Sequence, residues 1–379
     1  MAQKNSVDSS APTSKRLLSL DALRGFDMLL IAGGGGFFLE KTFEAFNLPF
    51  SDLLLRQLSH PAWGESITAW DFIFPLFLFM AGVSLFYSVS SAQTKGIEKK
   101  SIYTHAFRRM VILILLGIVY KNRPLHFDWE NIRYVSVLGR IGFTGFVATL
   151  IICNYKFRGQ VIWMFSLLIG YWLAVMFIPV PGIGAGVMTM EGNLVGYLDR
   201  MLVPGRLING IYDENGFTAQ IPATALVLMG ALTAQILKNG SFSEIKKLKL
   251  LSVAGGVSVV LGLIWGLHFP IVKYLWSSSF ILVTGGTCIL LLAVFYLLID
   301  YWGFKKWAFP FVVIGLNSLT IYMGSALIGF GFTADVLLNG FYQLSSDETI
   351  HAFLRSLGMM TLKWLFLYFL FCKKVFVKI

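Results

Sequence analysis

A histidine, a tryptophan and an aspartate lie within twelve residues, at the start of a long apolar run. His60 and Trp63 precede the run, and Asp71 opens it. An imidazole held by a carboxylate keeps the tautomer that a general base needs, and can then accept a proton from an amine or a hydroxyl group. The indole of Trp63 offers a flat apolar face of the kind on which sugar rings stack. We therefore expect His60 and Asp71 to be catalytic and Trp63 to bind a substrate.

Three charged residues follow a helical spacing in another apolar run. Asp21, Arg24 and Asp27 are spaced i, i+3 and i+6, so Arg24 can neighbour both carboxylates on one helix face. The structural interpretation is an ion pair that fixes one end of a helix bundle. The functional interpretation is an anion site, because a guanidinium binds phosphate in a bidentate manner that lysine cannot match.

Other polar side chains interrupt apolar runs. Asn317 and Tyr322 fall in the middle of one run, where each must find a hydrogen-bond partner in a neighbouring helix or a ligand. Arg140 enters a further run from the side of His60. All three are candidates for stabilising an oxyanion. The three cysteines have no metal-ligand spacing, so we predict no metal site.

The elements that must position these residues are membrane-spanning helices. The chain has 379 residues, of which 56% are hydrophobic and 13% charged, and its mean hydropathy is +0.71. Soluble domains carry about 25% charged residues. Apolar runs of about 18–25 residues recur, and each can cross about 30 Å of hydrocarbon. We predict an all-α polytopic membrane protein, a bundle of about ten transmembrane helices, near residues 18–39, 67–90, 104–120, 136–153, 160–179, 220–237, 250–268, 276–298, 308–330 and 356–372.

The distribution of positive charge orients this bundle. With both termini cytoplasmic, most lysine and arginine residues fall in the inner segments, as the positive-inside rule requires. The net charge of +11 is thus a topology signal, and we expect no nucleic-acid partner. In this orientation the bilayer surrounds the chain, Arg24 lies near the cytoplasm, and His60 lies outside.

The chain reads as one domain with a tail. Residues 1–16 are polar and serine-rich, and we predict a disordered cytoplasmic tail there, followed by a single transmembrane domain over residues 17–379. Gly33–Gly36 is expected to allow close helix packing, or else the close approach of a ligand. The two long outer segments, 40–66 and 180–219, are expected to be lids or binding loops.

Several motifs, taken in order, resemble a known family. Residues 20–25 resemble the opening signature of transmembrane acyltransferases. The run from His60 through Trp63 to Pro75 is similar to the heparan-α-glucosaminide N-acetyltransferase-like branch of that group. The resemblance continues through residues 133–140, 196–200, 212–216, 273–277 and 316–318. It covers nearly the whole chain, from about residue 17 to 379.

Members of that family take an acetyl group from acetyl-CoA on the cytoplasmic side and pass it to the amine of a terminal glucosamine on the far side. The active-site histidine of the family matches His60. The resemblance therefore implies an acetyl-CoA-dependent N-acetyltransferase, an amino-sugar or oligosaccharide acceptor, and a homodimer. We assign two sets of binding residues on this basis: for acetyl-CoA, Asp21, Arg24, Asp27, Asn317 and Tyr322; for the acceptor, Trp63, Arg140 and Lys273.

The sequence departs from the family pattern on the acceptor side. Gly35 and Val272 replace asparagines, Gly139 replaces a glutamine, and the spacing from Trp63 to Asp71 is one residue longer. O-acylation of a surface polysaccharide therefore stays open, as does an inactive chain that serves as a scaffold. A transporter is the rival from another class, but it would place its polar site at the midplane between repeats. The compact loops favour a bacterial inner membrane.

Overall fold

The computed structural model describes residues 17–46, 51–65, 67–122, 128–208 and 210–377. The expected tail, residues 1–16, lies outside the described residues. The described parts of the chain form helices and connecting turns, with two isolated bridges between Arg133 and Gly205 and between Val180 and Gly184. The predicted all-α fold is confirmed.

Eight helical segments among the described residues are long and apolar enough to cross a membrane in one piece. They are η2 with α4 (Ala69–Thr94), α5 (Lys99–Lys121), α6 (Val137–Asn154), α7 (Phe157–Phe177), α9 (Gln220–Lys238), α10 (Glu244–Gly266), α11 with η3 (Ser278–Tyr301), and α15 (Glu348–Cys372). Two bent pairs bring the number of candidate spans to ten, which agrees with the predicted number.

The bent pairs are the first span and the ninth. In the first, α1 (Leu18–Leu29) continues into the π-helix η1 (Leu30–Leu39) and α2 (Glu40–Phe46), and the chain turns by 67°. Gly33 adopts φ +114° there, a conformation that favours glycine, so it supports a bend as well as any close packing. In the ninth, η4 (Lys306–Ala308) and α12 (Phe309–Leu316) meet α13 (Ser318–Leu327) at 64°, with Asn317 at the break.

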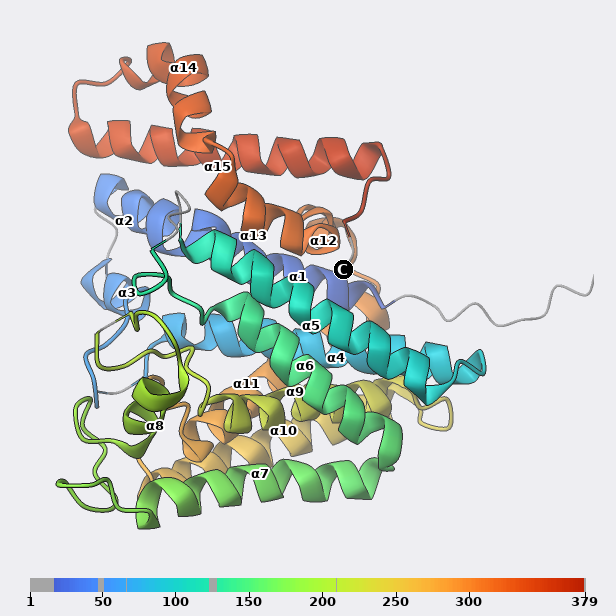
Figure 1. Cartoon of the computed structure of the whole chain (residues 1–379). Helices are drawn as coiled ribbons and strands as arrows, with labels where there is room; N and C mark the ends of the chain where they lie inside the picture. The colour runs from blue at the N-terminus through green and yellow to red at the C-terminus, as the bar shows by residue number, and fades with distance from the viewer. Residues whose placement is uncertain (1–16, 47–50, 66, 123–127, 209, 378–379) are drawn as a thin grey trace, which may run out of the picture.

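Three short helices complete the chain: α3 (Ser51–Gln57), α8 (Leu194–Leu202) and α14 (Phe330–Tyr342). Figure 1 shows α3, α8 and the long connections beside them at one end of the bundle, here called the loop face. The start of α1 and the end of α15 lie at the opposite end, here called the terminal face. The sequence did not predict α14, which packs as a hairpin on α15.

Helices α9 and α11 form the centre of the bundle. Burial covers 83% of the most apolar stretch of α9 and 67% of that of α11, against 22% for the peripheral α5, α10 and α15. Glycines allow close contacts between spans. A side-chain carbon at Gly25 would overlap the carbonyl of Phe311, and one at Gly315 would overlap that of Asp21. These two contacts fix α1 against α12 and so place Asp21 and Arg24.

Candidate functional site

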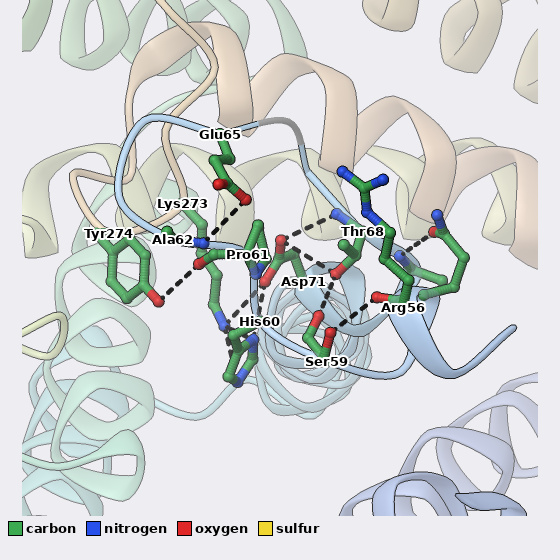
Figure 2. A network of polar contacts seen from close by, with 12 residues as sticks. Arg56, Ser59, His60, Pro61, Ala62, Glu65, Thr68, Asp71, Lys273 and Tyr274 are labelled. Atoms are coloured by element: carbon green, nitrogen blue, oxygen red, sulfur yellow. Dashed lines mark hydrogen bonds and ion pairs between the residues drawn. The ribbon is translucent and has the colours of Figure 1, made fainter. Parts of the chain in front are cut away.

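The loop face brings His60, Asp71 and Lys273 together (Figure 2). His60 Nδ1 lies 3.0 Å from Asp71 Oδ1, and Lys273 Nζ lies 2.8 Å from His60 Nδ1 and 3.2 Å from Asp71 Oδ1. The side chain of Asp71 is fully buried and that of Lys273 is 7% exposed, whereas 44% of the His60 side chain is accessible. The carboxylate and the ammonium thus balance each other behind an imidazole that opens to the outside.

The turn before α4 positions Asp71. Thr68 and Asp71 form a capping box at η2 (Ala69–Phe72), in which Asp71 Oδ2 accepts from the Thr68 amide at 3.1 Å. The Thr68 hydroxyl donates to the carbonyl of Ser59, the residue before His60, at 2.7 Å. One carboxylate therefore caps the helix with one oxygen and faces His60 and Lys273 with the other.

The loop that carries His60 is held by Tyr274. The Tyr274 hydroxyl donates to the Pro61 carbonyl at 3.1 Å, and burial raises the pKa of this hydroxyl, which keeps it protonated. Trp63 stacks on the ring of Tyr274 at 5.3 Å, meets Tyr212 edge to face at 4.8 Å, and donates to the Met188 carbonyl. Tyr274 thus covers one face of the Trp63 ring. The predicted stacking of a sugar on Trp63 would use the opposite face of the ring.

Lys273 lies on the connection between α10 and α11, and hydroxyl groups anchor that connection. Ser277 Oγ accepts from the Val272 amide at 3.1 Å, and Ser279 Oγ donates to the Phe269 carbonyl at 2.6 Å. Sequence reasoning assigned Lys273 to the acceptor but missed its place beside His60. The two residues are 213 positions apart, and no spacing rule links them.

Arg140 lies behind this cluster and is fully buried. Its guanidinium packs 4.3 Å over the Trp276 ring and 5.6 Å from the Phe74 ring, and it donates to the Glu214 carbonyl. The structure therefore brings Arg140 near the predicted site, but in its supporting layer.

A cavity of about 650 Å³ opens among α1, α4, α5, α6 and α12, and both Asp21 and Arg24 line it. Arg24 donates to Ser84 Oγ on α4, and its Nη1 lies 3.6 Å from Asp21 Oδ1. Arg109 of α5 lines the same cavity, and its Nε has no hydrogen-bond partner among the described residues. Sequence reasoning missed Arg109, because the basic stretch in which it lies looked like a topology signal alone.

A second cavity of about 370 Å³ adjoins the first between α4, α5 and α6. Arg109 and Ser88 line both cavities, so the two form one recess around the Arg109 side chain. Along α4 the first cavity extends from Ser88 to Phe77. Phe77 is six residues from Asp71, which is about 9 Å along a helix. The recess therefore approaches the loop-face cluster from the other side of the bundle.

Three predicted residues do not line the recess. Asp27 is fully buried on α1, and its carboxylate oxygens have no hydrogen-bond partner among the described residues. Asn317 donates to the Val375 carbonyl and accepts from the Val377 amide, so it ties the bend between α12 and α13 to the C-terminal segment. Tyr322 stacks on Tyr120 at 4.5 Å. In the part of the chain that the structure describes, no group of three or more His, Cys, Asp or Glu side chains could hold a metal ion.

Two curated proteins are similar to this chain over most of its length. No protein-family model matches the chain. It is similar to heparan-alpha-glucosaminide N-acetyltransferase of Homo sapiens, with 25% identity over 427 aligned positions that cover 96% of this chain and 60% of the human protein. The enzyme of that name from Mus musculus is also 25% identical, over 97% of this chain and 61% of its own length. The chain thus spans about 60% of the length of these curated relatives. Over nearly its whole length, the chain is distantly similar to the heparan-alpha-glucosaminide N-acetyltransferases.

Proposed function

We propose that this protein is a membrane acetyltransferase that carries an acetyl group from one face of the bilayer to the other. The donor is acetyl-CoA, bound from the terminal face. The acceptor is the amine of a glucosamine-type sugar or oligosaccharide at the loop face. The names of the two relatives support N-acetyl transfer to a glucosaminide, and the two sites on opposite faces support a transmembrane route.

The distribution of basic residues supports a cytoplasmic terminal face. The connections α4–α5, α6–α7, α9–α10 and α11–α12 and the end of α15 all fall on this face, because successive spans alternate in direction. Cations gather there, as the positive-inside rule requires: Lys95, Lys99, Lys100, Lys156, Arg158, Lys238, Lys246, Lys247, Lys249, Lys305, Lys306, Lys373 and Lys374. This orientation gives the recess access to cytoplasmic acetyl-CoA.

One observation carries the proposal. The recess that contains the guanidinium groups of Arg24 and Arg109 extends along α4 to Phe77, which lies about 9 Å along the helix from Asp71, the partner of His60. Arg24 and Arg109 bind the phosphate groups of the donor, which guanidinium groups recognise well. The thin arm of the donor then extends along α4 past Phe77. Its thioester reaches the loop face, where His60 is accessible.

The chemistry at His60 follows from its partners. In the tautomer that carries its proton on Nδ1, the imidazole donates to Asp71. Its Nε2 lone pair then faces Lys273 Nζ at 3.3 Å, and it can accept a proton from the acceptor amine in place of the lysine contact. His60 takes a proton from the acceptor amine while the amine nitrogen attacks the thioester carbonyl. The carbon–sulfur bond breaks, the thiolate leaves, and the proton passes to it or to solvent. The alternative course is a transient acetyl-imidazole on His60, which ping-pong kinetics would reveal.

The test is a transfer assay with the purified protein in nanodiscs. Radiolabelled acetyl-CoA is offered with glucosamine, chitosan oligosaccharides and sugars that have hydroxyl groups only. The variants are His60→Ala and, as a matched control, His351→Ala on α15, where the histidine contacts Tyr342 far from the cluster in the chain. We expect label on the amino sugars with the wild type and the control, and none with His60→Ala.

The other outcomes are equally clear. Transfer to hydroxyl-only sugars would make the protein an O-acyltransferase. Normal transfer by His60→Ala would remove His60 from the mechanism. If sealed vesicles instead accumulate unmodified sugar and no acetylated product forms, the protein is a transporter and the proposal fails.

A further inference from the structure

We propose that Arg140 is a positioning residue, which holds helix α4 with Asp71 and the connection with Lys273 in register beneath His60. As a role in acetyl transfer, this inference rests on the proposed function. It differs from the sequence-based assignment, which placed Arg140 in contact with the acceptor. The argument starts from the two aromatic rings that the guanidinium contacts.

Each ring belongs to an element that carries one member of the cluster. Phe74 follows Asp71 by three residues, so it lies within one turn of η2 and α4. Trp276 follows Lys273 by three residues, and its amide donates to the Lys273 carbonyl at 2.9 Å. The two rings contact each other edge to face at 5.0 Å, and the guanidinium packs against both. One cation thus joins the two supports of the cluster.

The backbone of Trp276 shows how strictly this turn is specified. Its φ is +51°, in the left-handed region that a bulky residue rarely adopts. Such a conformation persists only where the surroundings hold it. The Trp276 ring is fully buried, and the guanidinium of Arg140 covers it at 4.3 Å. Arg140 is thus one of the groups that hold the turn presenting Lys273, together with Phe74 and Phe280, whose rings also contact Trp276.

The bonding of Arg140 fits support better than recognition of a ligand at the open site. The side chain is fully buried, whereas 44% of the His60 side chain is accessible. The guanidinium donates through Nη2 to the Glu214 carbonyl, and its Nε and Nη1 have no hydrogen-bond partner among the described residues. A buried charge held mainly by rings is costly, and it persists where its geometry is useful.

The test compares Arg140→Lys with Arg133→Lys. Lysine keeps the charge at position 140 but loses the planar group that lies on the rings. Arg133 is a matched control, since it is also a buried arginine, but its guanidinium forms a bidentate pair with Asp213, whereas the guanidinium of Arg140 packs on Phe74 and Trp276. Displacement of catalytic groups by about 1 Å costs about 100-fold in rate, so we expect Arg140→Lys to lower kcat about 100-fold with the donor KM unchanged.

A second readout needs no substrate. Diethyl pyrocarbonate acylates neutral imidazole, and mass spectrometry of the modified peptide follows His60 alone as pH is varied. The titratable groups that face His60 are Asp71 and Lys273, with Tyr274 and Glu65 on the adjoining loops. We expect Arg140→Lys to shift the pH profile of His60 modification. Arg133→Lys should lower the melting temperature but leave the pH profile of His60 modification unchanged.

Two substitutions at Trp276 serve as a control for misfolding of the Arg140 variant. Trp276→Phe keeps a ring under the guanidinium and should retain most activity, whereas Trp276→Leu should behave like Arg140→Lys. Equal losses in Arg140→Lys and Arg133→Lys would reduce Arg140 to a stabilising residue. A raised acceptor KM with unchanged kcat would make it an acceptor contact. If the wild type transfers no acetyl group yet the His60 profile still separates the two variants, the proposed function fails and the positioning role stands.

Discussion

At the scale of single residues, the cluster on the loop face depends on one buried carboxylate. Asp71 pairs with Lys273, orients His60 and caps η2 through Thr68. The pair between Asp71 and Lys273 is almost fully buried, so each charge compensates the other. Removing one partner should therefore cost both activity and stability.

Asp71→Asn separates these two effects. Asparagine still accepts from Thr68 but leaves the Lys273 ammonium unpaired, so we expect the free energy of unfolding to fall by about 3–5 kcal/mol. Activity should fall by about 10²–10⁴-fold, because the orientation of His60 is lost. Adding Lys273→Met should recover much of the stability, as seen in the melting temperature, and none of the activity. Recovered activity in the double variant would show that the charge pair is not needed for the reaction.

The recess offers a test with neighbouring residues. Arg109 lines both cavities, whereas Arg108, the preceding residue on α5, is exposed. A hydrogen bond to a charged group contributes about 1.5–3 kcal/mol, so Arg109→Gln should raise the KM for acetyl-CoA about 10–100-fold. Arg108→Gln should leave it unchanged. Equal effects of the two substitutions would place the donor phosphates outside the recess.

At the scale of elements, the sequence predicted the straight spans well and the breaks poorly. Hydropathy alone locates a helix that must cross hydrocarbon, and all ten candidate spans match predicted runs. The bends at Gly33 and Asn317 depend on contacts with distant segments: Lys363 of α15 donates to the Ala32 carbonyl, and Asn317 bonds the C-terminal segment. Those partners are more than 50 residues away, so no local pattern reveals them.

The site shows the same division. His60 and Asp71 were predicted together because they are close in the chain and each bears a reactive group. Lys273 joins them only through folding, and Arg109 was hidden among basic residues that also set topology. Spacing along a chain carries information about one helix or turn, and not about which helices become neighbours.

Helix α8 provides a prediction on pH. Asp199 of α8 is fully buried; its Oδ1 accepts from the Thr218 amide and hydroxyl, and burial raises the pKa of this carboxyl. A raised pKa means that the folded protein binds this proton more tightly than the unfolded chain. The contribution of Asp199 to stability is therefore full below the pKa of the unfolded chain and is lost as pH rises through the folded-state pKa.

Asp199→Asn should remove that loss, because the amide cannot release a proton in this range and still accepts from Thr218. We expect the melting temperature of the variant, relative to wild type, to rise as pH increases from about 4 to 8. Asp52→Asn, at an exposed position of α3, is the control and should track the wild type. Parallel profiles for wild type and Asp199→Asn would mean that Asp199 titrates alike in the folded and unfolded chains.

At the scale of the whole molecule, the two faces have different chemistry. The terminal face carries the start of α1, the end of α15 and the basic connections, and Leu17 and Val377 at this end line the recess. The loop face carries the accessible histidine. A protein built this way can join reactants that never share a compartment. The proposed function therefore requires a fixed orientation in the membrane, and that orientation can be measured without any substrate.

Cysteine labelling tests the orientation. Of the three native cysteines, Cys153 and Cys288 are buried and Cys372 is exposed. The variant Cys372→Ser therefore has no exposed native cysteine that would react with the label. In that background, Asp52→Cys reports on the loop face and Lys95→Cys on the terminal face, since both positions are exposed. A membrane-impermeant maleimide added to intact cells should label position 52 at once and position 95 only after permeabilisation. The reverse pattern would put His60 in the cytoplasm beside free acetyl-CoA, and no acetyl group would then need to cross the bundle.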